Sequence, residues 1–347
     1  MIKVSILIPC YNAEQWIAQA IESAINQTYP HTEVIVVDDG STDRSLEIIK
    51  SFGDAIRWET GINRGGNVAR NKLLELSTGE WLQYLDADDY LLPDKIERQV
   101  KFLDKKSSGE NIDIDIDIIY SPVIAEYYCK NNPAQEYTRE LNDPLVTIPE
   151  PHDHLTLLIR WQLPQTGACL WRKQAIIEVG GWKENQVCCQ EHELYSRLLM
   201  NKKKFLFCQE TYAVYRVFNG QTISTKNISI TYKNRLEIIE KIQEYIKNIN
   251  NQNPLYFQII NQVKFDCARA IWLFDKEWAI QIVNTVNQNS DFFIPTGKNA
   301  THMYRFFYRL LGFSLTEEIA LVTRLIRKLR LIKFNFNSLK QILTHYK

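Results

Sequence analysis

The stretch WLQYLDADDYLLPD, residues 81–94, places an apolar run directly before three acids in four positions. Residues 81–85 are typical of a strand that enters a buried core. Asp86, Asp88 and Asp89 then gather negative charge where that strand reaches the surface. Like charges this close repel and raise one another's pKa, so a positive partner is expected there. A polar turn that caps the next helix would explain one or two of these acids, but not Asp86 together with Asp88.

The residues around this stretch repeat one pattern, an apolar run followed by a helical stretch. The pattern predicts strands at residues 3–8, 33–37, 56–60 and 80–85, and helices at residues 14–27, 41–50, 68–76 and 93–103. Strands and helices that alternate with short connections favour an α/β fold with an open, mostly parallel sheet covered on both faces. Ligands bind beyond the carboxyl ends of such strands. A polar cluster follows each strand (PCYN, DDGSTD, GINRGG and DADD), so we expect one site on this rim.

The composition is that of a globular protein with an uneven distribution of charge. The chain has 347 residues, of which 45% are hydrophobic, and a formal net charge of zero, which argues against a nucleic-acid partner. Residues 295–347 hold ten Lys/Arg and two Asp/Glu, which leaves 31 and 39 for the rest of the chain. A basic end on an acidic body predicts an anionic partner for that end. Seven scattered cysteines and the lack of a long apolar run predict a reduced, cytoplasmic protein.

Beyond the fourth strand the pattern is less regular. Residues 112–120, IDIDIDIIY, alternate strictly and predict a strand. We expect its Asp113, Asp115 and Asp117 to form a solvated face rather than a second metal site. Residues 126–150 are polar and predict an irregular loop. The C-terminal part of the chain has helical spacing.

The acids on the rim are suited to binding a metal ion and a nucleotide. Two carboxylates two residues apart, such as Asp86 and Asp88, can hold Mg²⁺ or Mn²⁺ through oxygen ligands. A cation there would screen the charge of a diphosphate leaving group. Asp38 and Asp39 end the second strand, where an acid usually binds a nucleoside. A turn with a helix cap is the alternative for these two acids, and both can hold together because the cap needs only one side chain.

Three segments closely resemble the nucleotide-sugar-binding half of glycosyltransferase family 2, whose members are inverting enzymes of the GT-A fold. The segments are SILIPCYNAEQWIAQAIESAINQTYPHTEVIVVDDGSTD (5–43), NRGGNVARN (63–71) and WLQYLDADDYLLPDK (81–95). The resemblance implies a GT-A glycosyltransferase domain over residues 1–225, with a nucleotide-sugar-binding half at 1–110 and an acceptor half at 111–225. A helical C-terminal region, basic at its end, would follow over residues 226–347.

The resemblance also implies a role for each matching residue on the nucleoside side. Pro9, Tyr11 and Asp39 would line the nucleoside pocket, with Asp39 accepting a hydrogen bond from the base. Asn63 and Gly65 would lie along the loop under the donor.

A second group of matching residues falls on the diphosphate side. Arg70 would lie on the helix under the donor. Asp86 would contact the ribose or the metal's water shell, and Asp88 would bind a divalent cation, Mn²⁺ or Mg²⁺, directly. VYRVFNGQTIS, residues 214–224, resembles the loop that closes the family's site, so Arg216 is expected to approach the diphosphate.

A later segment, LPQTGACLWRKQAIIEVGGWKENQVCCQEHELYSRLL (163–199), resembles the part of the family that supplies the catalytic Asp. By spacing to Leu194 and Arg197, that Asp falls at Glu191 in this chain. A Glu carboxylate does the same general-base work but reaches one methylene further. His192 stays open as the alternative base, because imidazole titrates near neutral pH. An ion pair with Arg197 or with a surface Lys is the purely structural alternative for Glu191.

Together these features predict an inverting glycosyltransferase. It would move a sugar from a nucleoside-diphosphate sugar, expected to be UDP-linked, to a hydroxyl of a saccharide or lipid-linked acceptor, assisted by a divalent cation. The alternative is a non-catalytic nucleotide-sugar-binding or scaffold protein that kept the donor pocket, which the Glu at the position of the catalytic Asp leaves open. PCYNAEQW contains neither GxGxxG nor a Gly-rich basic loop, which argues against a dehydrogenase or a sugar nucleotidyltransferase.

The basic end of the chain mixes arginine with apolar residues at helical spacing. This holds in MYRFFYRLLGF (303–313) and in EIALVTRLIRKLRLIKF (318–334). One interpretation is a helix that packs its apolar stripe on the body of the protein. The other is an interfacial helix over residues 303–334 that binds an anionic membrane surface. It would place the enzyme beside a lipid-linked acceptor at the inner membrane face.

Overall fold

The computed structural model describes residues 1–107, 115–128, 137–141, 153–209, 211, 213–218, 227–251, 253–288, 293–297 and 300–345. The chain forms two compact units, Met1–Gln252 and Asn253–Lys347. Helix α9 (Ile228–Asn248) therefore belongs to the first unit, so the division between units falls after α9 and not at residue 225.

In the described part of the first unit, seven strands form a central sheet in the order β10-β6-β9-β4-β1-β2-β3. The strands are β1 (Val4–Cys10), β2 (Thr32–Asp38), β3 (Arg57–Thr60), β4 (Trp81–Tyr84), β6 (Ile118–Tyr120), β9 (Cys169–Arg172) and β10 (Phe205–Phe207). β1 pairs in parallel with β2 and β4, β2 with β3, and β6 with β10, whereas β9 runs antiparallel to β4 and β6. The predicted α/β fold with an open, mostly parallel sheet is confirmed.

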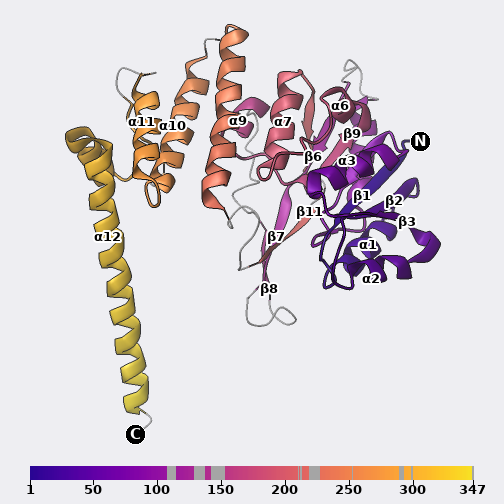
Figure 1. The fold of residues 1–347 in the computed structure, drawn as a ribbon, viewed down its shortest axis with the longest axis horizontal. Coiled ribbons are helices and arrows are strands. Elements are labelled where there is room, and N and C mark those ends of the chain that lie inside the picture. Colours follow the sequence, from indigo (N-terminus) through magenta and orange to yellow (C-terminus); the bar gives the residue numbers. More distant parts are fainter. Residues whose placement is uncertain are drawn as a thin grey trace. The chain divides into compact units, whose positions relative to one another are not determined.

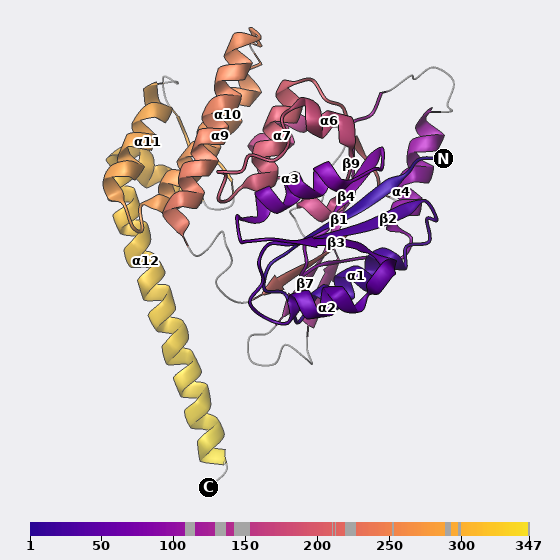
Figure 2. The same ribbon diagram turned by 45° about the vertical axis from the view of Figure 1, so that its right-hand side comes forward.

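Helices cover both faces of this sheet. α1 (Ile17–Ile25) and α2 (Ser45–Ser51) lie on one face and α3 (Gly66–Leu76) lies on the other, as Figures 1 and 2 show. α1 buries Ile17, Ala20, Ile21 and Ala24, the apolar stripe that its sequence spacing predicts. Besides α9, the other helices in the described part of the unit are η1 (Gly53–Ala55), α4 (Lys95–Ser107), α5 (His154–Ile159), η2 (Thr166–Ala168), α6 (Lys173–Glu178) and α7 (Gln190–Met200).

A second sheet, in the order β5-β11-β7-β8, shows that the loop predicted for residues 126–150 was wrong in part. Its strands are β5 (Tyr90–Leu91), β7 (Val123–Tyr128), β8 (Tyr137–Leu141) and β11 (Ala213–Phe218). Glu126 makes β7 look polar in sequence, yet Glu126 is 1% exposed and accepts a hydrogen bond from the hydroxyl of Tyr90 at 2.6 Å. Such a buried polar partner cannot be recognised from spacing alone.

The strand predicted for residues 112–120 is also shorter than expected, because β6 covers only Ile118–Tyr120 among the described residues. Asp117 is 8% exposed, and its carboxylate accepts the main-chain N–H of Lys204 at 2.9 Å, so it does not belong to a solvated face. Asp115 is mostly exposed and pairs with Arg172. Asp113 lies outside the described residues.

The second unit consists of α10 (Pro254–Ile271), α11 (Lys276–Gln288) and α12 (His302–His345), which bends at Gly312. Phe265 packs against Tyr304, Tyr308 and Phe313 in its core. A buried ion pair between Arg269 and Glu317 joins α10 to α12, and the hydroxyl of Tyr304 donates to Glu317 at 2.6 Å. Among the described residues of the chain, no helix is long and apolar enough to cross a membrane.

Gly40 provides a test of how closely the loops on the rim pack. It has φ of 74°, and a Cβ at this position would lie 2.7 Å from the main-chain N of Asn63. Gly53 has φ of 53° but open space around it, so it is a matched control. We expect Gly53→Ala to lose about 1 kcal/mol of unfolding free energy from left-handed strain, and Gly40→Ala to lose at least about 2 kcal/mol more from the clash. Urea unfolding measures both, and equal losses would contradict the close approach.

Candidate active site

The acids that follow β4 lie on a tight turn beside β11. The main-chain N–H of Asp89 donates to the carbonyl oxygen of Asp86 at 3.0 Å, which closes the turn. Asp89 points inward, because it is 1% exposed and its Oδ1 accepts the main-chain N–H of Arg216 at 2.8 Å. Asp86 and Asp88 are only partly buried. This acid turn, residues 86–89, therefore fastens itself to β11 through Asp89 and leaves the other two carboxylates accessible.

Arg216 supports the acid turn from within the protein. Its side chain is 3% exposed, and its guanidinium donates to the main-chain carbonyl of Asp88 at 2.7 Å and to Gln19. The guanidinium carbon lies 4.7 Å from the ring centroids of both Trp16 and Tyr90. Arginine suits such a position because its plane stacks on aromatic faces while its edge donates hydrogen bonds. The residue predicted to approach a diphosphate thus lies against the main chain of the predicted metal ligand.

The acid turn carries negative charge that its surroundings do not fully balance. Burial, together with the nearby Asp86, raises the pKa of Asp88 to about 6. Burial also raises the pKa of Asp89 well above its usual range, and the carboxylates of Asp88 and Asp86 add to that effect. Burial and like charge both disfavour the ionised forms of these carboxyls, and an added positive charge would favour them. The turn therefore offers a favourable position for a cation.

No group of three or more His, Cys, Asp or Glu side chains is arranged to hold a metal ion in the part of the chain that the structure describes. Asp86 and Asp88 nevertheless provide carboxylate oxygens of the kind that Mg²⁺ and Mn²⁺ bind. These ions commonly keep waters and complete their shell with substrate phosphates. The residues present fit a cation that is shared with a phosphorylated ligand better than one held by the protein alone.

Asp39 joins the end of β2 to the loop that precedes α3. Its two carboxylate oxygens accept the main-chain N–H groups of Arg64 and Gly65, each at 2.8 Å. Gly65 is the N-cap of α3 and has φ of 97°, a conformation that favours glycine. Each carboxylate oxygen retains a second lone pair. Asp39 can therefore hold the loop and still accept a hydrogen bond from a ligand.

Pro9, Tyr11 and Asn63 lie on the same rim of the sheet. Pro9 is one residue before the end of β1, and Tyr11 is one residue beyond that end and 50% exposed. Asn63 is exposed, and its main chain packs against Gly40. The ends of three neighbouring parallel strands thus present an accessible surface with an exposed aromatic ring.

Arg70 on α3 connects the acid turn to the start of α7. Its guanidinium donates to Asp86 Oδ1 at 2.7 Å and to Gln190 Oε1 at 2.8 Å. The guanidinium carbon lies 5.0 Å from the ring centroid of Trp182, and Arg70 is 9% exposed. Glu191 follows Gln190 directly, so Arg70 brings the predicted base and the predicted metal ligands into one site.

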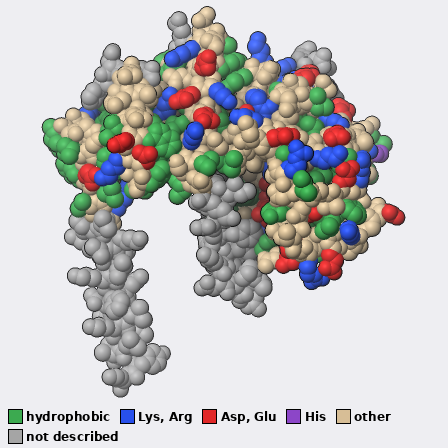
Figure 3. Space-filling view, in the orientation of Figure 1, with side chains coloured by type: hydrophobic (Ala, Val, Ile, Leu, Met, Phe, Trp, Pro, Cys, Tyr) green, Lys and Arg blue, Asp and Glu red, His purple; other side chains and the backbone are tan. Residues whose placement is uncertain are grey.

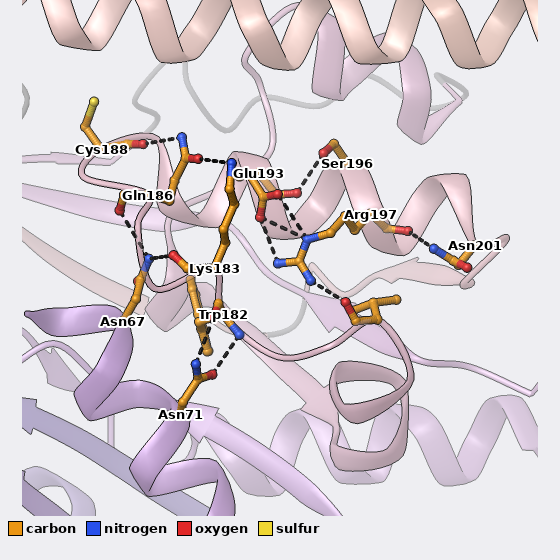
Figure 4. Close-up of polar contacts among 11 residues, drawn as sticks. Asn67, Asn71, Trp182, Lys183, Gln186, Cys188, Glu193, Ser196, Arg197 and Asn201 are labelled. Carbon is orange, nitrogen blue, oxygen red and sulfur yellow. Dashed lines mark hydrogen bonds and ion pairs between the residues drawn. The ribbon is translucent and has the colours of Figure 1, made fainter.

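Two asparagines of α3 hold the loop that leads into α7 (Figure 4). Asn67 Nδ2 donates to the main-chain carbonyls of Lys183 and Gln186, at 2.7 and 3.2 Å. Asn71 both accepts the N–H of Trp182 and donates to its carbonyl, each at 2.8 Å. Because these bonds involve main-chain atoms, they fix the path of the loop and with it the start of the helix that carries Glu191.

The ion pair considered as the structural alternative for Glu191 is made by another residue. Arg197 Nη2 pairs with Glu193 Oε2 at 2.8 Å, one turn along α7, as Figure 4 shows. Burial alone would raise the pKa of Glu191, but His192 and Arg70 outweigh that effect and lower it. Glu191 is therefore ionised at neutral pH and is not used by Arg197.

His192, the alternative base, has a different environment. It is 5% exposed, and its ring stacks on Trp161 with centroids 4.0 Å apart and planes 6° apart. Its Nδ1 lies 3.4 Å from Glu191 Oε1. Glu191 is the more exposed of the two side chains, so the carboxylate is easier for a substrate to reach.

Tyr215 on β11 is a site residue that the sequence did not indicate. Burial and the carboxylates of Asp89, Asp88, Asp86 and Glu191 all raise the pKa of its hydroxyl. The hydroxyl of Tyr215 therefore experiences the negative charge of both the acid turn and the predicted base. The sequence offered no clue to this, because neighbouring residues on a strand point to opposite faces and Arg216 was the residue expected to face the diphosphate.

Comparison with known proteins places these features in a family. The model of Glycosyl transferase family 2 matches residues 5–155. An uncharacterized glycosyltransferase of Rickettsia typhi, RT0329, is 30% identical over 260 residues, which cover 73% of this chain and 74% of the relative. An uncharacterized glycosyltransferase of Haemophilus influenzae is 42% identical over 104 residues, which cover 29% of this chain and only 42% of that relative.

Solved structures share the fold at low sequence identity. Residues 1–349 of Staphylococcus aureus TarS, in complex with UDP-GlcNAc, match with a TM-score of 0.64 at 16% identity, over 93% of this chain and 91% of that one. The mannosyltransferase PcManGT of Pyrobaculum calidifontis, in complex with GDP-Man and Mn²⁺, matches with a TM-score of 0.51 at 16% identity, over 91% and 82%. The predicted GT-A type fold with a helical C-terminal region is thereby confirmed. The chain belongs to glycosyl transferase family 2.

Proposed function

We propose that this chain transfers a sugar from a nucleoside-diphosphate sugar to an acceptor hydroxyl with inversion at the anomeric carbon. The observation that carries the proposal is the bridge that Arg70 makes between Asp86 and Gln190, because it joins a donor-side acid turn to the helix start that carries the candidate base. The alternative, a binding protein without turnover, rests on the Glu at position 191 in place of the family's Asp, and a measurement of turnover separates the two.

The nucleoside is assigned to the rim formed by β1, β2 and β3. Tyr11 offers an exposed ring for the base, with Pro9 beside it, and Asp39 offers the remaining lone pairs of its carboxylate to a base N–H. Asn63 and Gly65 lie on the loop that Asp39 holds. A UDP donor is supported by TarS, whose structure contains UDP-GlcNAc.

Glu191 is the general base in the proposed chemical step. Its carboxylate takes the proton of the acceptor hydroxyl while that oxygen forms a bond to the anomeric carbon. The bond from the anomeric carbon to the diphosphate oxygen breaks on the opposite face, and the electron pair leaves with the diphosphate. A Glu191 that is ionised at neutral pH is suited to this role. Arg70 holds the start of α7, which carries Glu191, beside the acid turn.

A divalent cation would be held by Asp88 directly, with Asp86 contacting its waters or the ribose, and it would supply charge compensation for the departing diphosphate. Burial and the neighbouring Asp86 raise the pKa of Asp88 despite Arg216 and Arg70, and a cation would offset this effect. The Mn²⁺ in the structure of PcManGT supports the choice of metal. Arg216 would keep the main chain of Asp88 in place during the reaction.

The C-terminal unit supports an anionic membrane surface as a partner. On α12, Met303, Phe306, Leu310, Leu315 and Val322 are each more than half exposed. Hydrophobic side chains reach the surface over the described part of α12 in Figure 3. Arginines interleave with them along the helix, and this combination favours binding at a lipid headgroup boundary. A lipid-linked acceptor would then be presented to the enzyme at the membrane.

Loss of Asp88 tests the cation. We expect Asp88→Asn to abolish transfer and to leave the fold intact, because the amide cannot replace an anionic ligand. We also expect wild-type protein to bind UDP more tightly with Mn²⁺ than with a chelator, and Asp88→Asn to lose most of that difference in calorimetry. Turnover at the wild-type level in the variant, or equal UDP affinity with and without Mn²⁺ in the wild type, would contradict the assignment.

Substitution of Glu191 tests the base. Glu191→Gln should lower kcat by about 10²–10⁴-fold and preserve donor binding, since the amide keeps the shape but accepts no proton. Glu191→Asp should retain part of the activity. Release of free sugar from a nucleotide sugar without acceptor would distinguish a working enzyme from a binding protein. If His192→Ala proves more damaging than Glu191→Gln, the base is misassigned.

Vesicle sedimentation tests the membrane surface. Full-length protein should pellet with anionic vesicles at low salt and release at high salt, because each basic residue adds about 1 kcal/mol near such a surface. A double change of Leu310 and Leu315 to Asp should abolish pelleting. Ile280→Asp is a matched control, since Ile280 is an exposed apolar residue on α11. Wild-type protein that stays in the supernatant at low salt would rule the interaction out.

A further inference from the structure

His192 is part of a stacked column that ends at Glu191. The imidazole lies parallel to the indole of Trp161 with centroids 4.0 Å apart. The guanidinium carbon of Arg235 lies 4.6 Å from the centroid of a Trp161 ring. Tyr195 meets the imidazole edge-on at 6.1 Å. The ring of His192 therefore has little freedom to rotate.

The two ring nitrogens of His192 add no hydrogen bond that would stabilise the fold of the described residues. Neither ring nitrogen makes a hydrogen bond within the described residues, although His192 is 5% exposed. Burying such a nitrogen without a partner costs about 1–3 kcal/mol, so a histidine kept here calls for another reason. The polar contact that it does make is at 3.4 Å, between its Nδ1 and Oε1 of Glu191. A modest shift of the Glu191 side chain would turn this contact into a charge-assisted hydrogen bond.

We propose that His192 is a positioning residue for the base, and that the column of Arg235, Trp161 and His192 aims its Nδ1 at the Glu191 carboxylate. This inference rests on the proposed function. His192 does not take the acceptor proton itself. An Nδ1–H donor would favour the ionised carboxylate and hold it in one rotamer while it waits for the acceptor.

The column also explains how α9 contributes to a site that it does not line. Arg235 lies on α9, and Asn234 Nδ2, on the same helix, approaches Cys188 Sγ at 3.2 Å just before α7 begins. Cys189, the N-cap of α7, has φ of 58°, a strained conformation for a residue other than glycine. α9 thus contacts the start of α7 through the side chain of Asn234 and through the stacked rings that end at Glu191.

The pH dependence of the base follows from its surroundings. Burial raises the pKa of Glu191, whereas His192 and Arg70 lower it. The ionisable groups that interact with Glu191 come from several elements: Arg70 of α3, Cys169 of β9, Tyr215 of β11, and Cys189, His192 and Tyr195 at or on α7. Because the thiols and phenols are neutral at pH 7, loss of the His192 donor leaves only a main-chain hydrogen bond and Arg70 to oppose the effect of burial on the pKa of Glu191. The pKa of Glu191 should then rise.

Two variants separate the hydrogen-bond donor from the stacked ring. His192→Phe keeps a ring on Trp161 and removes Nδ1, whereas His192→Asn removes the ring and keeps a donor near the Nδ1 position. His154→Phe is the matched control, because His154 also lies among aromatic rings, those of Tyr120 and Phe205. The measurement is the pH profile of kcat, with the donor KM followed in parallel.

We expect His192→Phe to lower kcat about tenfold, with the donor KM unchanged, and to move the acidic limb of the kcat profile to higher pH. His192→Asn should keep that limb near its wild-type position, and His154→Phe should change neither quantity. A wild-type profile in His192→Phe would overturn the proposal. So would an upward shift in His192→Asn, which also decides the case if His192→Phe fails to fold. An active Glu191→Gln would refute the proposed base instead, so the two failures remain distinguishable.

Discussion

The candidate active site depends on one buried guanidinium. Arg70 lies 16 residues before Asp86 and 120 residues before Gln190, and it hydrogen-bonds both. Removing Asp86 or Gln190 would leave the guanidinium of Arg70 mostly buried with a missing partner, which is unfavourable because the charge stays desolvated. The acid turn and the start of α7 are therefore not free to separate. The local half of the site, built near the N-terminus, and the remote helix that carries Glu191 become a single arrangement through this side chain.

The parts of the site that lie on the rim of the parallel sheet could be predicted from the sequence, because strand periodicity fixes where each strand ends. Asp39 and Asp88 follow strands whose apolar character is plain, so their places needed no knowledge of distant contacts. The partners of these residues could not be predicted. Arg197 lies four residues after Glu193 on α7 and pairs with it at 2.8 Å, a choice that depends on side-chain rotamers and not on spacing to Glu191. Burial of Glu126 likewise depends on Tyr90, which lies in another element.

Several residues that the family resemblance assigns to ligand binding already make hydrogen bonds within the protein. Both oxygens of Asp39 hold the N–H groups of the loop before α3, and Arg216 holds the carbonyl of Asp88. The physical reason is that a rim made of loop ends exposes main-chain groups that strands no longer pair, and buried groups of this kind must find partners. Each carboxylate oxygen of Asp39 keeps a second lone pair for a further hydrogen bond. The buried guanidinium of Arg216 already donates to Asp88 and Gln19 and has fewer donors for a ligand. Asp39 can therefore serve both the loop and a nucleoside, and Arg216 is better suited to support than to contact.

Asp86 and Asp88, the two acids proposed to act on the cation, differ in the positive charge that the protein already places beside them. Arg70 already neutralises much of the charge on Asp86, at 2.7 Å, while burial and the neighbouring Asp86 raise the pKa of Asp88 to about 6. A divalent cation is expected to stabilise Asp88 more than Asp86. Besides forming a metal–oxygen bond, it would offset the unfavourable ionisation of the Asp88 carboxyl. Asp88 is thus the stronger candidate for direct ligation, and Asp86 for a contact through water or the ribose. The sequence DAD is nearly symmetric, and the asymmetry between its acids comes from where α3 places one arginine.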